Sequence, residues 1–360
     1  MEKIRFIYPT EGDMLTDAAG KRLTDGTLMT EAAVESAAEV WIQGHRAVKD
    51  ADGLWRAPVM LNGYETLLTA QAGGEEASVT VYRLPKAAGK YSLSVDDNIW
   101  WLAELTLKPR DSLFDHPYLA VYKRAHELYG AKVRFNLFYQ VEGTAIDKYG
   151  PFNLSMMTDR YKEEFRANAD WLHLAFHSLQ ESPAHPYREG TYEQVLHDCG
   201  AVHQEIIRFA GEQTLEHATT IHFGSCTKEG IRALQDLGMK ELMAFMSLNK
   251  EGVPSVSYNM SVDQVLKSQR YGFWRDPEDG MIYGKIDVVM NSHSPEKIVE
   301  ILEQERREHP QRGFVEIMIH EQYFYEDYAA YEPDYEERIL AGCRWCHQQG
   351  LVGAFAEDVL

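Results

Sequence analysis

The chain has 360 residues, of which 44% are hydrophobic and 26% are charged, a composition typical of a folded protein with a large core. Its formal net charge of −20 at pH 7 argues against nucleic acid or anionic membrane as partners, because both reward clustered Lys and Arg. No apolar run is long enough to span a membrane, and the first residues already resemble a strand and leave no room for the apolar core of a signal peptide. We therefore expect a cytoplasmic protein with no nucleic-acid or membrane partner.

Residues 1–88 have a sequence pattern typical of a small all-β domain. Short β-rich segments alternate there with Gly, Asp, Asn and Pro turn signals, and almost no helical period is present. This spacing predicts a β-sandwich. The segment 8–15 (Tyr-Pro-Thr-Glu-Gly-Asp-Met-Leu) also resembles the opening of the immunoglobulin-like modules that precede bacterial carbohydrate enzymes. The predicted strands are 3–8, 30–34, 39–42, 55–60, 65–71 and 77–83.

Residues 89–360 change to a repeated alternation of apolar strand and helix. Such alternation implies a parallel sheet, and seven or eight repeats imply a (β/α) barrel. The predicted fold class is thus α/β, with a barrel preceded by the small β-sandwich. The predicted strands are 91–95, 132–139, 171–176, 219–223, 241–245, 282–289, 314–319 and 352–355, and the predicted helices are 119–128, 192–209, 228–237 and 295–307.

Polar side chains follow most of these strands, at the edge where a parallel barrel gathers its active site. The first strand ends in two adjacent carboxylates, Asp96 and Asp97. Adjacent residues leaving a strand point to opposite sides, so one carboxylate can hold a metal while the other handles a proton. The remaining strand ends carry Gln140 and Glu142, His177, His222, Asn291 and His293, and His320 and Glu321.

Four segments resemble motifs of the polysaccharide deacetylase superfamily, whose fold is an irregular (β/α) barrel. They are 93–97, ending in Asp-Asp; 129–135, a Gly followed by the second strand; 176–178, Phe-His-Ser; and 314–320, an apolar strand ending in His. The resemblance implies that Asp96 is the catalytic base, that Asp97 and His177 bind a metal ion, and that His320 is the general acid.

The chain departs from that family at two motifs. Glu181 stands four residues after His177, where the family has its second metal-binding histidine, and the family's Arg-rich motif is not evident. The third ligand is then either Glu181 or His222. Asp97, His177 and one of these residues would supply three N/O ligands and leave one position open for water, as catalytic zinc sites require.

The first hypothesis is therefore a metal-dependent hydrolase that removes N- or O-linked acetyl groups from a carbohydrate-like substrate, and the divalent ion that we expect in it is zinc. Zinc would lower the pKa of its bound water and polarise the acyl carbonyl. Asp96 would take the proton of that water, and His320, oriented by Glu321, would protonate the leaving group.

Two alternatives remain open at this point. A metal-independent glycoside hydrolase would draw a carboxylate pair from Asp96, Glu142 and Glu321, set ~5–9.5 Å apart across the sugar. A non-catalytic carbohydrate-binding barrel would carry the same residues without converging histidines. A pocket in which the histidines do not meet would favour either alternative.

Overall fold

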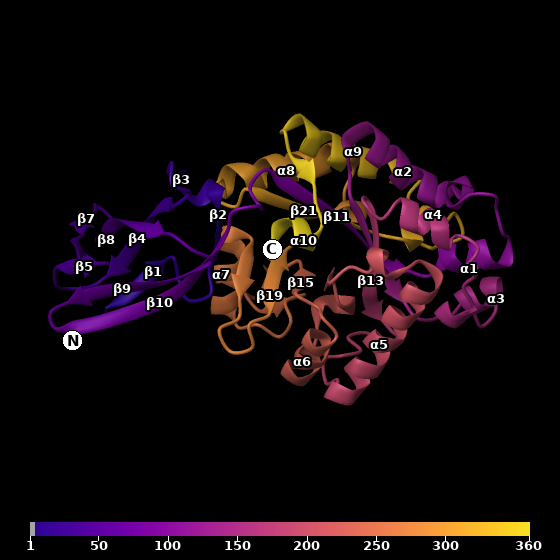
Figure 1. Ribbon diagram of the computed structural model, residues 1–360, viewed down its shortest axis with the longest axis horizontal. Helices are drawn as coiled ribbons and strands as arrows, with labels where there is room; N and C mark the ends of the chain where they lie inside the picture. Colours follow the sequence, from indigo (N-terminus) through magenta and orange to yellow (C-terminus); the bar gives the residue numbers. More distant parts are fainter. Residues whose placement is uncertain (1–3) are drawn as a thin grey trace.

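The computed structural model describes residues 4–360, which form an N-terminal module of β-strands followed by a larger α/β body (Figure 1). The N-terminal module (residues 4–84) lies at one end of an elongated molecule, and the α/β body (residues 90–360) makes up the rest. The predicted strand 3–8 begins at Arg5, and Lys3 lies outside the described residues. The proposed domain boundary after residue 88 falls in the turn between the two parts.

The N-terminal module consists of two five-stranded sheets, ordered β1-β4-β8-β7 with β3 beside β4, and β2-β10-β9-β5-β6. Apolar residues of both sheets, among them Leu28, Val59, Leu68 and Val81, are fully buried in one shared core. Facing sheets with a common core are the arrangement of a β-sandwich, whereas the immunoglobulin-like character stays a prediction. The strands are β1 (Arg5–Tyr8), β2 (Met14–Thr16), β3 (Lys21–Arg22), β4 (Leu28–Glu35), β5 (Val40–Ile42), β6 (His45–Arg46), β7 (Val48–Lys49), β8 (Trp55–Leu61), β9 (Glu65–Ala72) and β10 (Glu75–Leu84).

The α/β body contains two sheets that are largely parallel, which confirms the predicted α/β class. One has the order β13-β12-β11-β21-β20 with β22 beside β11, and the other has the order β14-β15-β19-β18, in which only β18 is antiparallel. The strands are β11 (Lys90–Asn98), β12 (Val133–Phe138), β13 (Leu172–Ser178), β14 (Ala218–Thr219), β15 (Glu241–Ala244), β18 (Phe273–Arg275), β19 (Ile282–Lys285), β20 (Val288–Val289), β21 (Phe314–His320) and β22 (Val352–Gly353), with a small hairpin of β16 (Ser247–Leu248) and β17 (Pro254–Ser255).

Two connections join these sheets. The chain leaves β19 and enters β20 of the other sheet after two residues, and an isolated parallel bridge pairs Leu174 of β13 with Leu215. The predicted strand 282–289 is thus split between the sheets. The predicted strand 219–223 is wrong in extent, because Phe223 has φ 60° and the chain turns into a short 3-10 helix there. A closed barrel stays a prediction.

Helices cover the sheets on both sides, with α2, α8 and α9 along one side and α5 and α6 along the other (Figure 1). The ends of α2 follow ordinary capping rules, because Pro117 occupies its first turn and Gly130 ends it at φ 66°. The helices are α1 (Trp100–Leu107), α2 (Pro117–Tyr129), α3 (Ala145–Tyr149), α4 (Lys162–Ala167), α5 (Tyr192–Phe209), α6 (Lys228–Asp236), α7 (Val262–Tyr271), α8 (Pro295–Glu308), α9 (Tyr335–Gln348) and α10 (Ala356–Val359), and the 3-10 helices near the strand ends are η5 (His222–Gly224), η6 (Met290–Ser292) and η7 (Gln322–Phe324).

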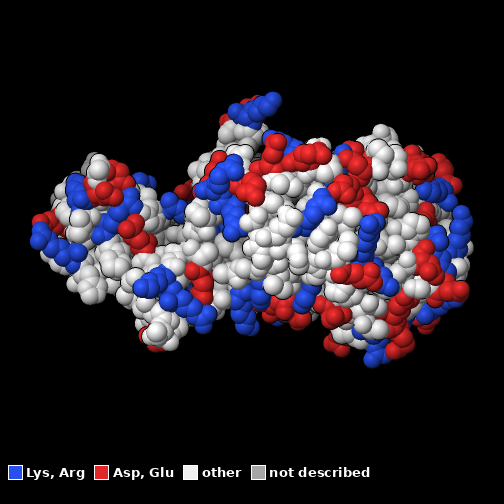
Figure 2. Space-filling model, turned by 90° about the horizontal axis from the view of Figure 1, so that it is seen from above, with Lys and Arg blue, Asp and Glu red and all other residues white. Residues whose placement is uncertain are grey.

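The module and the α/β body pack against each other through an apolar cluster of their own. Met14, Tyr82 and Leu84 of the module are buried with Phe273 and Ile282 of the body. The indole Nε1 of Trp274 also donates to the carbonyl of Glu11 at 2.9 Å. Acidic and basic side chains are interspersed on the face seen in Figure 2. Among residues 4–360, no helix has the length and apolar character needed to cross a membrane.

Candidate metal centre

Asp97 sits on an irregularity at the end of β11. The pairing of β11 with β12 shifts register between Val95 and Asn98, and Asp97 has the left-handed φ of 65°. Such a bulge re-aims a side chain at a local conformational cost. As a result both Asp96 and Asp97 line one cavity, so the strand alternation that predicted opposite directions for them does not apply.

The bulge is held by Asn98, which is fully buried. Its amide nitrogen donates to the carbonyl of Val95 at 2.6 Å, and its amide oxygen accepts from the hydroxyl of Tyr118 at 2.8 Å and the indole of Trp101 at 3.2 Å. These bonds fix the backbone on the far side of Asp97. The strained residue is therefore supported from the core of the α/β body.

His177 enters the site from β13 with its ring orientation fixed. Its Nδ1 lies within hydrogen-bond distance of the carbonyl oxygen of Thr220, which can only accept, so Nδ1 carries a hydrogen. The other ring nitrogen, Nε2, lies 2.9 Å from Oδ1 of Asp97. A histidine held by its Nδ1–H on a backbone carbonyl is the usual arrangement of a metal-binding imidazole.

His222, in η5 after β14, uses its two ring nitrogens the other way round from His177. Its Nε2 lies 3.0 Å from the backbone carbonyl of Glu181, so Nδ1 is the nitrogen left with a lone pair. That Nδ1 lies 3.1 Å from Nε2 of His177 and 3.3 Å from Oδ1 of Asp97. Three ligating atoms therefore meet at one point, although their residues are up to 125 positions apart in the chain (97 to 222).

The spacing of these three atoms fits a small cation. Bonds of 2.0–2.1 Å in a tetrahedron, as zinc makes to N and O, place neighbouring ligand atoms about 3.3 Å apart. The separations of 2.9, 3.1 and 3.3 Å are close to this value. Within residues 4–360, Asp97, His177 and His222 are the group of His, Cys, Asp and Glu side chains with metal-binding geometry.

The ionisation of Asp97 and His177 is also consistent with a cation at this place. Burial opposes ionisation of Asp97, but hydrogen bonds from His177 and His222 hold its pKa well below the ordinary value. Burial lowers the pKa of His177, yet the carboxylates of Asp96 and Asp97 outweigh it and raise that pKa to about 9. The site thus favours positive charge between its carboxylates, which a proton or a metal ion can supply.

Asp96 and His320 flank this group on neighbouring strands, where they are register partners of β11 and β21. One carboxylate oxygen of Asp96 accepts from the amide of Asn136 at 2.6 Å. Nδ1 of His320 lies 2.8 Å from Oδ1 of Asn291, and that oxygen also accepts the backbone N–H of His320 at 3.2 Å. The oxygen accepts both bonds, so Nδ1 of His320 carries a hydrogen and Nε2 is the nitrogen left for proton transfer.

Glu321 lies outside the site, which corrects its predicted role. Its fully buried carboxylate accepts the backbone N–H groups of Ile99, Trp100 and Trp101 at 2.7–2.9 Å, at the beginning of α1. The residue that orients His320 is Asn291. The sequence placed both residues at strand ends, but only the fold decided which of them contacts His320.

Glu181 stays at the rim. Its side chain is half exposed, and Oε1 lies 3.9 Å from Nε2 of His222, the ring nitrogen that faces away from Asp97. It lines the cavity but is not one of the three converging residues. Of the two residues that the sequence offered as third ligand, Glu181 and His222, only His222 therefore joins Asp97 and His177.

The reactive side chains line a cavity of about 330 Å³. It is lined by Asp96, Asp97, His177, Glu181, Thr220, His222, Phe223, Gly224, Phe245, Val256, Ile286, Val289, Met318, His320, Tyr323 and Tyr328. A second cavity of about 260 Å³ shares Asp97, Glu181 and Tyr328 with it and is lined mostly by polar groups and Trp100. Asp97 thus lies between the two cavities, whereas His177 and His222 line the first one alone.

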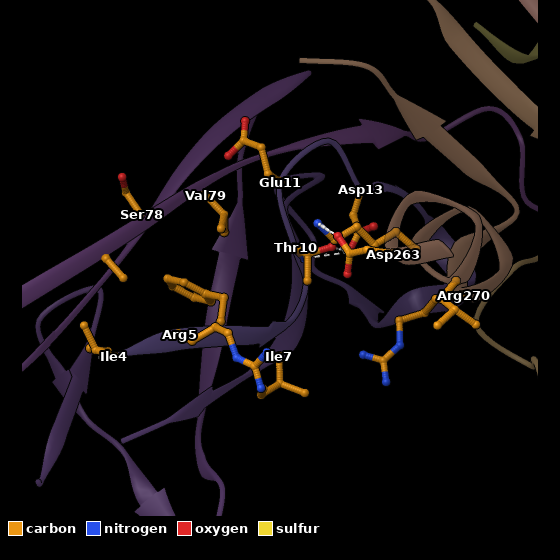
Figure 3. A pocket seen from close by; sticks show the side chains of 14 residues that line it. Ile4, Arg5, Ile7, Thr10, Glu11, Asp13, Ser78, Val79, Asp263 and Arg270 are labelled. Atoms are coloured by element: carbon orange, nitrogen blue, oxygen red, sulfur yellow. Dashed lines mark hydrogen bonds and ion pairs between the residues drawn. The ribbon is translucent and has the colours of Figure 1, made fainter. Parts of the chain in front are cut away.

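A larger cavity of about 700 Å³ shares no lining residue with these two and lies between β1, β10 and α7 (Figure 3). Asp13 is one of its lining residues, and its Oδ2 accepts from the backbone N–H of Thr10 at 2.6 Å. The ionisable lining residues, such as Arg5, Asp263 and Arg270, include no histidine or cysteine. This cavity offers no set of groups for metal or nucleophilic chemistry.

Comparisons with known proteins give likeness only at the level of structure. No family model matches the sequence, and no curated protein sequence matches it. Similar solved structures include a CE4 family pseudoenzyme from Bacillus anthracis (12% identity, 76% of this chain and 65% of that chain, TM-score 0.40). Others are the 4-alpha-glucanotransferase from Thermococcus litoralis (11%, 76% and 40%, 0.48) and a family 4 acetyl xylan esterase from Clostridium thermocellum in complex with a cobalt ion (11%, 73% and 86%, 0.34). The function of this chain is therefore inferred from its own side chains.

Proposed function

We propose that the protein is a metal-dependent hydrolase that removes acyl groups, N- or O-linked, from a carbohydrate-like substrate. The observation that carries this proposal is the convergence of Asp97, His177 and His222 in one cavity with Asp96 and His320. Three N/O ligands with one position left for water are the donor set of a catalytic zinc site. A divalent ion there would lower the pKa of its bound water towards ~7 and polarise the acyl carbonyl.

The chain's own residues then divide the proton transfers. Asp96 is held by Asn136 through one oxygen, so its other oxygen is left to take a proton from the attacking water. His320, whose Nδ1–H donates to Asn291, would in its doubly protonated form give a proton from Nε2 to the departing oxygen or nitrogen. An acid and a base on adjacent strands suit an acyl transfer in which one proton is taken and one is given.

The alternatives lose their supporting features. A pocket without converging histidines would have favoured a metal-independent glycoside hydrolase. In this pocket, however, Nε2 of His177 and Nδ1 of His222 lie 3.1 Å apart. Its candidate Glu321 is bonded to the backbone of α1 instead. A non-catalytic barrel was predicted to carry no converging histidines, so the contacts of both rings with Asp97 favour the enzyme.

Metal content tests the proposal directly. We expect the purified protein to bind about one zinc ion per chain after dialysis, and Asp97→Asn and His177→Ala to lose it, because each removes a ligand. His197→Ala, whose side chain is 77% exposed on α5, is the matched control and should keep the ion. Elemental analysis by mass spectrometry gives the readout.

Activity separates ligands from proton-transfer residues. Asp96→Asn and His320→Ala should keep the zinc ion but lower kcat for release of acetate from acetylated sugars by about 10²–10⁴-fold. Equal metal content in wild type and Asp97→Asn, together with equal rates of acetate release, would refute the proposal. Loss of metal without any rate on acylated substrates would instead support the non-catalytic alternative.

A further inference from the structure

We propose that the acyl group accepted by this site is longer than acetyl, a linear chain of about four to eight carbons seated along an apolar part of the reaction cavity. This inference rests on the proposed function and adds its substrate class. It follows from what lines the cavity beside the reactive groups.

The lining of the 330 Å³ cavity is divided in its chemistry. The reactive side chains come from β11, β13 and β21, apart from His222, which lies in η5. The ends of the other sheet contribute apolar side chains, with Phe223 in η5, Phe245 after β15, and Ile286 after β19. Val256, Val289 and Met318 complete this apolar wall. A carbonyl held at the metal group therefore has an apolar surface beside it.

The apolar wall has a buried floor and an exposed rim. Ile286 and Met318 are buried and pack with Met243 in a small cluster of their own. Phe223 and Phe245 are 40% and 38% exposed, which is unusual for so large an apolar side chain. Apolar side chains left uncovered next to a polar centre are typical of a ligand-binding groove.

Phe223 is held in place at a conformational cost. It has φ 60°, and its ring lies 4.4 Å from that of His222 and 4.6 Å from that of His185, between centroids. A left-handed φ is rare for a phenylalanine and is conformationally unfavourable. The strain places an aromatic face directly beside a metal-binding residue, where it can contact the first carbons of an acyl chain.

The volume exceeds what an acetyl group needs. One water-sized group needs only about 10–15 Å³ on the scale by which this cavity measures 330 Å³, so the cavity holds several such groups. An acetyl group brings three. The polar part of a substrate has its own space in the 260 Å³ cavity, which carries Gln140, Glu142 and Thr144 beside Trp100. Acyl chain and sugar would therefore lie on different sides of the metal group.

The reaction is a simple hydrolysis. The oxygen of one water molecule bonds to the acyl carbon, and the bond from that carbon to the substrate's oxygen or nitrogen breaks. Asp96 takes one proton of the water and His320 supplies one to the leaving atom. The products are a short fatty acid and a free hydroxyl or amine, so no further reactant is needed.

The acyl-length profile tests the inference. With zinc-loaded protein and p-nitrophenyl acetate, butyrate, hexanoate and octanoate as probes, we expect kcat/KM to rise about two- to fourfold per added methylene up to hexanoate. Val289→Trp narrows the cavity and should lower kcat/KM for hexanoate at least tenfold more than for acetate. Val253→Trp, 54% exposed in the β16–β17 hairpin, is the matched control and should leave the profile unchanged.

Each other outcome has a defined meaning. A preference for acetate, or a Val289→Trp variant that slows acetate and hexanoate equally, overturns the inference and leaves the proposed function standing. No turnover of any ester by loaded protein overturns both. If Val289→Trp does not fold, Phe245→Ala decides. It removes part of the exposed rim and should lower the hexanoate rate alone, and hexanoate should raise the Tm of wild type more than acetate does.

Discussion

At Asp97 the backbone takes a left-handed conformation, within the register shift between Val95 and Asn98. The sequence showed two adjacent carboxylates at a strand end, and the roles predicted for them depended on strand alternation. In the structure the bulge turns both carboxylates into one cavity, and only Asp97 contacts His177 and His222. The two carboxylates therefore still differ in role, but not because they point to opposite sides of the strand. The sequence identified the two residues as candidates, but it did not show in which direction each side chain points.

Asn291 illustrates the same limit of sequence at His320. The sequence placed Asn291 at the end of a predicted strand, without a role. In the structure its side chain fixes the tautomer and ring of His320, and its backbone carbonyl accepts from Arg338 at 2.7 Å. It is a positioning residue, since it acts through His320.

Replacing Asn291 tests this role. We expect Asn291→Ala to lower kcat by about 10- to 100-fold with little change in KM or metal content, because His320 loses the acceptor that fixes its tautomer. Asn291→Asp should restore most of the rate, and its carboxylate should shift the acidic group in the pH–rate profile to higher pH. Asn249→Ala, in the exposed hairpin, is the control. An Asn291→Ala enzyme with wild-type kcat would show that His320 needs no such partner.

Among the elements, α1 shows how a carboxylate can be misassigned. Glu321 follows β21 directly and resembles a catalytic neighbour of His320, yet it accepts three N–H groups at the beginning of α1, some 220 residues earlier in the chain. Helix N-termini leave such groups unpaired and favour negative charge. No local sequence pattern marks this pairing, because both partners are far apart in the chain.

The cap on α1 gives a stability prediction. Glu321→Ala leaves three backbone N–H groups without their acceptor in a buried place, so we expect a loss of about 3 kcal/mol or more in the free energy of unfolding. Glu321→Gln keeps one acceptor oxygen and should lose less. Urea denaturation measures both, with the exposed Glu326→Ala as control. A normal stability combined with a changed pH–rate profile would restore the catalytic role that the sequence suggested.

In the whole molecule, a buried contact joins the N-terminal module to the α/β body. The two parts share a buried apolar cluster and the bond from Trp274 to Glu11. Asp13 lies at this junction, where it is 1% exposed and its Oδ1 has no hydrogen-bond partner. Burial raises the pKa of Asp13 from 3.8 to about 7, although bonds from Thr10 oppose the change.

The raised pKa of Asp13 predicts a pH-dependent stability. Below pH 3.8 the carboxyl is neutral in both states and has no effect; between pH 3.8 and 7 only the unfolded chain loses the proton, so stability falls as pH rises. Asp13→Asn should therefore raise the free energy of unfolding at pH 8, by up to about 4 kcal/mol, but not near pH 4. Asp111→Asn, fully exposed in the α/β body, is the control. A gain independent of pH would contradict this origin.

The sequence by itself determined the α/β class, the change from a β-rich to an alternating pattern near residue 88, and most strands of the body. These strands could be recognised because parallel strands are buried on both faces and therefore consist of continuous apolar runs. It also determined that Asp96, Asp97, His177 and His320 stand at strand ends, whereas His222 lies in a 3-10 helix three residues after its strand. The tertiary structure alone decided that His222 joins Asp97 and His177, that Asn291 holds His320 and that Glu321 belongs to α1. These are contacts of a few ångströms between distant segments, set by bulges, 3-10 turns and strand register, and none of them has a period or spacing that a sequence can show.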